Sequence, residues 1–153
     1  MGVLKKNHKK IGVLGGTFDP PHVGHLEISK FAIKKLKLKF LIWAVTKKNP
    51  LKKKSYFSLQ KRINFSKNLV SKVGIIKIET YDDIIKSSKT INLVKYLKKK
   101  YKKSEIFFLI GSDNLIKFHK WHDWKKISNF CKIVVFPRTG YSKKAFKSKA
   151  YSY

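Results

Sequence analysis

The sequence predicts an α/β fold, namely a doubly wound, mostly parallel sheet of five or more strands. Short apolar runs alternate along the chain with longer segments in which apolar residues recur at helical spacing. This alternation is typical of parallel sheets that helices cover on both faces. Several apolar runs end in glycine or polar residues, as expected where a ligand crevice lies beyond the carboxyl ends of the strands.

Five apolar runs are predicted to be strands, at residues 11–14, 40–45, 73–78, 105–110 and 132–136. The segments between them supply the helices. An amphipathic helix is predicted over residues 22–38, where lysines fill the gaps between apolar positions, and a second begins after Ser58, a suitable N-cap residue. Two further helices are predicted over residues 90–101 and 121–130.

Length and composition fit a single domain. The chain has 153 residues, 42% of them hydrophobic, without an internal repeat, so we expect one domain over residues 1–153. Cys131 is the only cysteine, which excludes an internal disulfide, and its apolar surroundings predict a buried thiol. No run approaches the roughly 20 apolar residues of a membrane helix, and the basic start does not resemble a signal peptide, so we expect a cytoplasmic protein.

Lysine dominates the charge. Lys and Arg total 37 against 8 Asp and Glu, for a formal net charge of +29, yet only Arg62 and Arg138 are arginines. Such a surface should attract any polyanion in a salt-dependent manner. Specific recognition of bases favours arginine, and the aromatic residues lie mainly in apolar runs. A specific nucleic-acid-binding protein is therefore the least favoured function.

One segment carries most of the functional information: residues 15–25, GGTFDPPHVGH. Gly15 and Gly16 let the chain turn sharply after the first strand and approach a ligand closely. The helix that follows presents unpaired amides and the positive end of its dipole, which together suit a phosphate group. His22 and His25 share one face of its first turn, so we expect both at an anion site, at an exposed helix start where neither is needed for folding.

Two alternative interpretations of this segment are weaker. A histidine pair at this spacing can bind a metal, but only Asp19 offers a carboxylate nearby, and we expect Asp19 to cap the turn instead. The dinucleotide fingerprint G-x-G-x-x-G is absent, which argues against hydride transfer. No metal bound by protein side chains is therefore expected.

The whole string resembles the GxFDPxHxGH signature of the nucleotidyltransferase superfamily. The run IGSD at residues 110–113, followed by Leu115, Phe118, Trp121 and Trp124, is similar to the IGxDxLxxFxxW stretch of bacterial nicotinate-nucleotide adenylyltransferases. Further similarities lie at residues 49–52, Arg62, Thr90 and residues 136–141. The resemblance spans residues 11–141. It implies a Rossmann-like fold and an enzyme of NAD biosynthesis that joins nicotinate mononucleotide to ATP with release of pyrophosphate.

The residue roles follow only from this resemblance. It implies that the catalytic residues at the phosphates are His22, His25 and Lys52, with Lys53 as the alternative lysine. It implies ATP contacts from Gly15, Gly16, Thr17, Phe18, Gly24, Gly111 and Asp113, and mononucleotide contacts from Thr90, Trp121 and Arg138. Mg2+ is expected to bind through the substrate phosphates. Trp121 has an alternative interpretation as a core residue packed on Phe118, Trp124 and Phe130.

The resemblance is weakest after Gly140. The family closes with an ISSTxIR motif, and here the sequence offers lysines, Lys143 and Lys144 among them, for which we expect no fixed helix. Weak ATP binding by the 153-residue chain is therefore expected. Two alternatives stay open: another adenylyl- or cytidylyltransferase of the superfamily, or a truncated inactive member. The expected partners are ATP and nicotinate mononucleotide, with no membrane and no specific nucleic acid.

Overall fold

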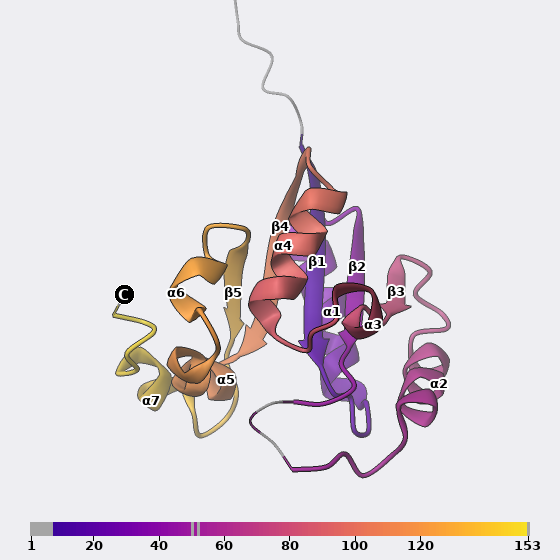
Figure 1. Cartoon of the computed structure of the whole chain (residues 1–153), viewed down its shortest axis with the longest axis horizontal. Helices are drawn as coiled ribbons and strands as arrows, with labels where there is room; N and C mark the ends of the chain where they lie inside the picture. The colour runs from indigo at the N-terminus through magenta and orange to yellow at the C-terminus, as the bar shows by residue number, and fades with distance from the viewer. Residues whose placement is uncertain (1–7, 50, 52, 153) are drawn as a thin grey trace, which may run out of the picture.

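The computed structural model describes residues 8–49, 51 and 53–152. Within them, five parallel strands form one sheet in the order β3-β2-β1-β4-β5 (Figure 1). The strands are β1 (Lys9–Gly16), β2 (Phe40–Val45), β3 (Ile76–Glu79), β4 (Ser104–Gly111) and β5 (Lys132–Phe136). The α/β fold with a parallel sheet that the alternating pattern predicts is confirmed.

Helices connect the strands and follow the last one. The longer helices are α1 (Val23–Leu36), α2 (Leu59–Leu69) and α4 (Thr90–Lys100). The short helices are α3 (Asp82–Ile85), α5 (Ser112–Lys117), the 3-10 helix η1 (Phe118–Lys120), α6 (Trp124–Ile127) and α7 (Ser142–Phe146). None of the helices in the described part of the chain is long and apolar enough to cross a membrane.

The strand order places a crevice beside the central strand. From β1 the chain moves outward through β2 to β3, then returns to β4 on the other side of β1 and continues to β5. The winding therefore reverses between β1 and β4, and ligands of doubly wound sheets bind beyond the carboxyl ends at such a point. β1 ends at Gly16 and β4 at Gly111, so both sequence motifs emerge at this edge.

Two apolar layers hold the helices to the sheet. Strand side chains alternate between them: Val13 and Ile42 face the layer that contains α4, whereas Leu14 and Trp43 face the layer that contains α1. Figure 1 shows α4 in front of the sheet and α1 behind it. We call these layers the α4-side core and the α1-side core. Because both faces are buried, the strands read as nearly continuous apolar runs.

Two of the predicted elements begin later in the structure than the sequence indicates. The helix expected over residues 121–130 is shorter, because Asp123 adopts a left-handed conformation (φ 50°) and α6 begins only at Trp124. The third strand begins at Ile76 instead of residue 73, because the chain turns between Val70 and Ile76 through two backbone hydrogen bonds. The helices α3, α5 and α7 were not predicted, since helices of four to six residues are too short to display an apolar period.

Candidate active site

The turn after β1 is held by close packing. A Cβ atom at Gly15, near the carboxyl end of β1, would lie 3.2 Å from the Phe108 ring, so a side chain at this position would require the ring to shift. Phe18 follows with a left-handed backbone (φ 50°) and a side chain that is 3% exposed. Its ring stacks on Trp43 at 4.8 Å. The side chain of Phe18 thus belongs to the core, and only its backbone is left for the expected ATP contact.

His22 and His25 close the N-terminus of α1 together. Nδ1 of His22 accepts a hydrogen bond from the Gly24 N–H (3.1 Å), and Nδ1 of His25 accepts one from the His22 N–H (3.1 Å). The ring centroids lie 3.9 Å apart. A Cβ atom at Gly24 would lie 2.8 Å from the His22 ring, so glycine is required for this cap. Because Nδ1 accepts, the proton of each neutral ring is carried by Nε2.

A chain of buried hydrogen bonds connects Trp43 of β2 to the first turn of this helix. Its indole N–H donates to the Ser29 hydroxyl (2.8 Å), and that hydroxyl donates to the carbonyl of His25 (2.7 Å). Trp43 and Ser29 are fully buried, so no water competes with these bonds. The chain of bonds runs from the middle of the sheet to the first turn of α1. The histidine pair is therefore positioned by β2 as well as by its own helix.

The electrostatic character of the helix start suits an anion. The first turn of α1 contains no acidic residue, and both basic residues of its last turn lie at the opposite end, at Lys34 and Lys35. The positive end of the helix dipole points toward the crevice beyond β1. The Gly24 and His25 N–H groups, which the sequence predicted to be unpaired, donate within the cap to Nδ1 and the carbonyl of His22. His22 is exposed there. The helix dipole and the imidazoles can together hold phosphate oxygens, and the phosphate role of both histidines stays a prediction.

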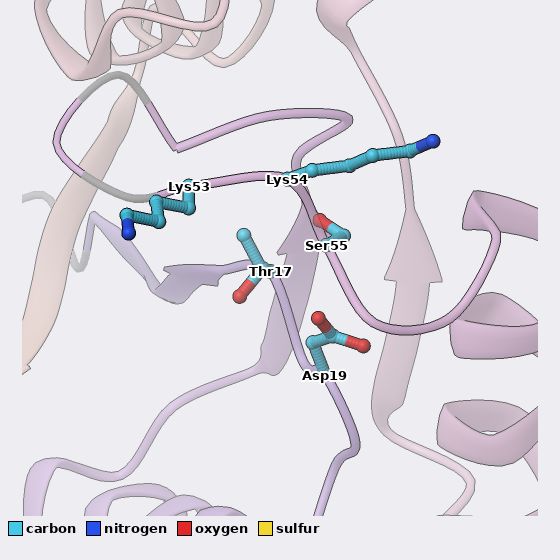
Figure 2. Close-up of a pocket in the computed structure, with 5 residues that line it drawn as sticks. All are labelled: Thr17, Asp19, Lys53, Lys54 and Ser55. Atoms are coloured by element: carbon cyan, nitrogen blue, oxygen red, sulfur yellow. The ribbon is translucent and has the colours of Figure 1, made fainter.

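A pocket of about 280 Å³ lies between two loops (Figure 2). One is the loop between β1 and α1, which we call the motif loop, and the other is the lysine-rich loop between β2 and α2, which we call the basic loop. Thr17 and Asp19 line one side of it, and Lys53, Lys54 and Ser55 line the other. In Figure 2 the side chain of Lys54 extends away from Asp19. Lys52, which the resemblance proposed as catalytic, lies outside the described residues. Lys53, the alternative lysine, lines the pocket.

Asp19 acts as a backbone cap, as expected, but for a segment distant in sequence. Its carboxylate accepts hydrogen bonds from the N–H groups of Tyr56 and Phe57, the latter at 2.8 Å. Both oxygens are used in this way, one by each amide. Asp19 thereby ties the motif loop to the end of the basic loop.

Gly111, Asp113 and Arg138 come together at the carboxyl end of β4. Nη1 of Arg138 donates to Oδ2 of Asp113 (2.8 Å), and the Arg138 N–H donates to the hydroxyl of Ser112 (2.8 Å). A Cβ atom at Gly111 would lie 2.4 Å from Oδ1 of Asp113, so the carboxylate folds back over the glycine. The resemblance gave Asp113 and Arg138 to different substrates, yet the two side chains form one ion pair.

Thr90 and Trp121 lie on the side of the sheet that contains the α4-side core. Thr90 is the first residue of α4, and its neighbour Ile91 is buried in that core. Trp121 is half-buried, with its ring 4.9 Å from Phe118 and 6.3 Å from Phe108. Trp121 thus has core partners and an exposed portion, so packing and ligand stacking are both open to it.

The structure corrects the sequence prediction for the residues after Gly140 and reveals the environment of Arg62. The lysines after Gly140 were expected to lack a fixed helix, and this is wrong for Lys143 and Lys144, which lie on α7. That helix buries Ala145 and packs against α5. Arg62 was matched to a helix position without a role, yet it is buried beneath the site and joined to four backbone carbonyls. Its sequence signals were its match to the family and its being one of only two arginines in a lysine-rich chain.

Comparison with known proteins identifies the family. A family profile described as cytidylyltransferase-like matches residues 13–152. A probable nicotinate-nucleotide adenylyltransferase of Pelagibacter ubique is 52% identical over 149 residues, covering 97% of this chain and 82% of that protein. One from Aquifex aeolicus is 39% identical over 129 residues, with 84% and 77% covered.

The fold is also that of a solved structure. A Plasmodium falciparum nicotinic acid mononucleotide adenylyltransferase complexed with APC superposes with a TM-score of 0.77 at 17% identity, covering 92% of this chain and 70% of that one. The resemblance inferred from the motifs and the Rossmann-like nucleotidyltransferase fold are thus confirmed. The chain belongs to the cytidylyltransferase-like family of nucleotidyltransferases and, within it, to the nicotinate-nucleotide adenylyltransferases.

Proposed function

We propose that this chain joins ATP and nicotinate mononucleotide to form nicotinate adenine dinucleotide and pyrophosphate, a step of NAD biosynthesis. A phosphate oxygen of the mononucleotide attacks the α-phosphorus of ATP, and the bond from that phosphorus to the oxygen bridging to the β-phosphate breaks. Pyrophosphate leaves with the electron pair. The observation that carries the proposal is the reciprocal histidine cap at a helix start that opens onto the reversal point of the sheet.

The chemistry needs positioning and positive charge more than a protein nucleophile, because negative charge develops on the oxygens around phosphorus. The imidazoles of His22 and His25 and the positive end of the α1 dipole would bind the ATP phosphates. The backbone at Gly15, Gly16, Thr17, Phe18 and Gly24 would approach them closely. Lys52 or Lys53 would add charge from the basic loop, and the pocket lining supports Lys53.

The carboxyl end of β4 would bind the sugar and the acceptor. In this proposal Asp113 accepts hydrogen bonds from ribose hydroxyls of ATP beside Gly111. Arg138, which forms the ion pair with Asp113, binds the mononucleotide. The Arg138 side chain is 62% exposed, which leaves it accessible to a ligand. Thr90 and Trp121 would border the nicotinate ring, through a hydrogen bond and a stacking surface. The ion pair would then couple the two substrate sites.

Enzymes of this family generally use a divalent metal. Asp19, the carboxylate of the motif loop, has both oxygens engaged with amides, and the described residues contain no cluster of three or more His, Cys, Asp or Glu that could hold an ion. We propose Mg2+ held by the substrate phosphates, where it neutralises charge on the triphosphate. Chelation with EDTA should abolish turnover, and added Mg2+ should restore it.

A substrate panel tests the activity. The full chain is incubated with ATP or CTP and, in turn, with nicotinate mononucleotide, nicotinamide mononucleotide and pantetheine phosphate, and pyrophosphate release is measured. We expect the highest kcat/KM for ATP with nicotinate mononucleotide. A preference for CTP or for pantetheine phosphate would assign the chain to another transferase. Absence of turnover with every pair would favour the inactive alternative. The cytoplasmic location belongs to the same proposal, and cell fractionation tests it.

A further inference from the structure

Arg62 is a buried cation whose partners are all backbone carbonyls. The residue is 2% exposed. Its Nη1 donates to the carbonyls of Thr17 and Thr46, both at 2.7 Å, and its Nη2 and Nε donate to those of Lys47 and Phe57, both at 3.1 Å. Among the described residues, no acidic side chain forms an ion pair with it. A buried charge without a counterion persists only where its hydrogen bonds are complete.

The four carbonyls belong to three segments that are distant in sequence. Thr17 lies in the motif loop after β1, Thr46 and Lys47 follow β2, and Phe57 directly precedes the N-cap of α2. Thr46 and Lys47 begin the basic loop that lines the pocket, and Phe57 ends it. One guanidinium thus joins both ends of that loop to the motif loop. A lysine ammonium, with donors on a single atom, does not span such a set of acceptors.

Two carboxylates complete the same junction. Asp19 accepts from the N–H of Phe57, whose carbonyl accepts from Arg62. Asp82 accepts hydrogen bonds from the Lys47 N–H (2.8 Å) and the Thr46 hydroxyl (2.9 Å). Thr46 and Lys47 are therefore held by Asp82 through their donors and by Arg62 through their carbonyls. At each end of the basic loop, a carboxylate thus accepts from backbone N–H groups and the Arg62 guanidinium donates to backbone carbonyls.

The bond to Thr17 also sets a peptide orientation at the site. A trans peptide places its C=O and the following N–H on opposite sides. Since the Thr17 carbonyl points at Arg62, the Phe18 N–H points away from it. Phe18 holds a left-handed backbone that a residue with a Cβ atom rarely adopts (φ 50°). Its backbone therefore depends on being held at both sides, by Arg62 at Thr17 and by the stacking of its ring on Trp43.

We propose that Arg62 is a positioning residue for adenylyl transfer: it holds the motif loop and both ends of the basic loop at the separation that the reacting phosphates need. This inference rests on the proposed function. The Arg62 side chain touches no substrate in this arrangement. It acts through the Thr17–Phe18 backbone on one side of the pocket and through Lys53 on the other.

The test compares Arg62→Lys and Arg62→Met with the control Val70→Ala. Val70 is also buried (5% exposed) but caps the opposite end of α2, away from the pocket. Amide hydrogen exchange of the ligand-free proteins is followed in peptides covering residues 46–48 and 55–57. Binding of inorganic pyrophosphate is measured by calorimetry, and kcat and KM are measured at a temperature where each variant is folded.

We expect both Arg62 variants to lose exchange protection at residues 46–48 and 55–57, whose amides are hydrogen-bonded in the parent, and to bind pyrophosphate more weakly. For Arg62→Lys, kcat should fall by at least about tenfold, the scale of a small displacement of reacting groups. The KM for the mononucleotide should change much less, because Trp121 and Thr90 are not held by Arg62. Val70→Ala should show a lower Tm without these changes.

Three results would overturn the inference. They are unchanged exchange at residues 46–48 and 55–57 in Arg62→Lys, an equal fall of kcat in Val70→Ala at matched loss of Tm, or a kcat of Arg62→Lys within twofold of the parent. If Arg62→Met does not fold, Arg62→Lys carries the test alone. An inactive parent chain would contradict the proposed function, while the exchange data would still decide whether Arg62 holds the loops.

Discussion

His22 and His25 cap α1 reciprocally, each through the Nδ1 atom of its imidazole, with their ring centroids 3.9 Å apart. The two residues therefore have a structural role in addition to the proposed phosphate contact. The sequence alone predicts that alanine at either position leaves the thermal midpoint nearly unchanged. The cap alters this expectation, because loss of an N-cap acceptor typically costs about 1 kcal/mol.

His22→Asn separates the two roles. Asparagine is among the best N-cap residues, so its side-chain oxygen can accept the Gly24 N–H and keep the helix start. His22→Ala should lower the free energy of unfolding by about 1 kcal/mol, and His22→Asn should lower it much less. Both should reduce kcat by about 10²–10³, the usual effect of removing one charge-stabilising donor. Denaturant unfolding and pyrophosphate release give the two quantities. Half the parental rate in His22→Asn would show that His22 serves only the cap.

Trp121 is predicted to discriminate between the two substrates. Trp121→Ala should raise the KM for the mononucleotide far more than the KM for ATP, since base–aromatic stacking is worth about 1–3 kcal/mol. It should also lower the Tm, because the ring packs on Phe118 and Phe108. Trp121→Phe, which retains a smaller ring, is the control for packing. Equal changes of both KM values in Trp121→Ala would support a core role alone.

Cys131 should behave as an inert thiol in the folded chain. Burial raises the pKa of its thiol to about 12, well above the usual value of about 8.5. At pH 8 the thiolate fraction is then far lower than in the unfolded chain, so alkylation by iodoacetamide should report global unfolding. Mass spectrometry of labelled protein in rising urea measures it. Rapid labelling without urea, before the far-UV signal changes, would contradict this burial.

The same pKa shift predicts loss of stability in alkali. Folding favours the neutral thiol, so Cys131 contributes stability that is fully present below the ordinary thiol pKa of about 8.5 and is lost as the pH rises toward about 12. The Tm of the parent should therefore fall more steeply between pH 8 and pH 11 than that of Cys131→Ala. Burial also raises the pKa of Tyr81, and since Tyr81 is common to both proteins its effect cancels in the comparison.

Nucleic-acid binding should be nonspecific and sensitive to salt. With a net charge of +29 carried almost entirely by lysine, binding to duplex DNA at low salt is expected. A contact with 6–10 phosphates would lose about 10³–10⁵ in affinity between 50 and 200 mM salt. Fluorescence anisotropy with two unrelated duplexes measures this. If the protein still bound one duplex in preference to the other at physiological salt, the interpretation of the lysines as a solvated surface without specific nucleic-acid binding would be wrong.

The sequence by itself determined the sheet and the edge at which the site lies. Apolar strands and amphipathic helices alternate strongly enough to specify a parallel, doubly wound sheet, because burial of both faces leaves a continuous apolar signal. The residues that follow β1 and β4, from Gly15 to His25 and from Gly111 to Asp113, are informative because a functional strand end needs glycine and polar groups in consecutive positions. The N-cap at Ser58 could likewise be predicted from the sequence, since capping is a local interaction.

Only the tertiary structure decided how distant segments meet. The bond from Arg62 to Thr17 spans 45 positions and the ion pair of Asp113 with Arg138 spans 25, and neither has a periodic or local signature. The acceptors of Arg62 are backbone carbonyls, which every residue carries, so no residue type marks them. The spacing of His22 and His25 likewise places both rings on one face of the helix, but it does not show which backbone N–H groups their Nδ1 atoms accept from, because that depends on the rotamer of each ring.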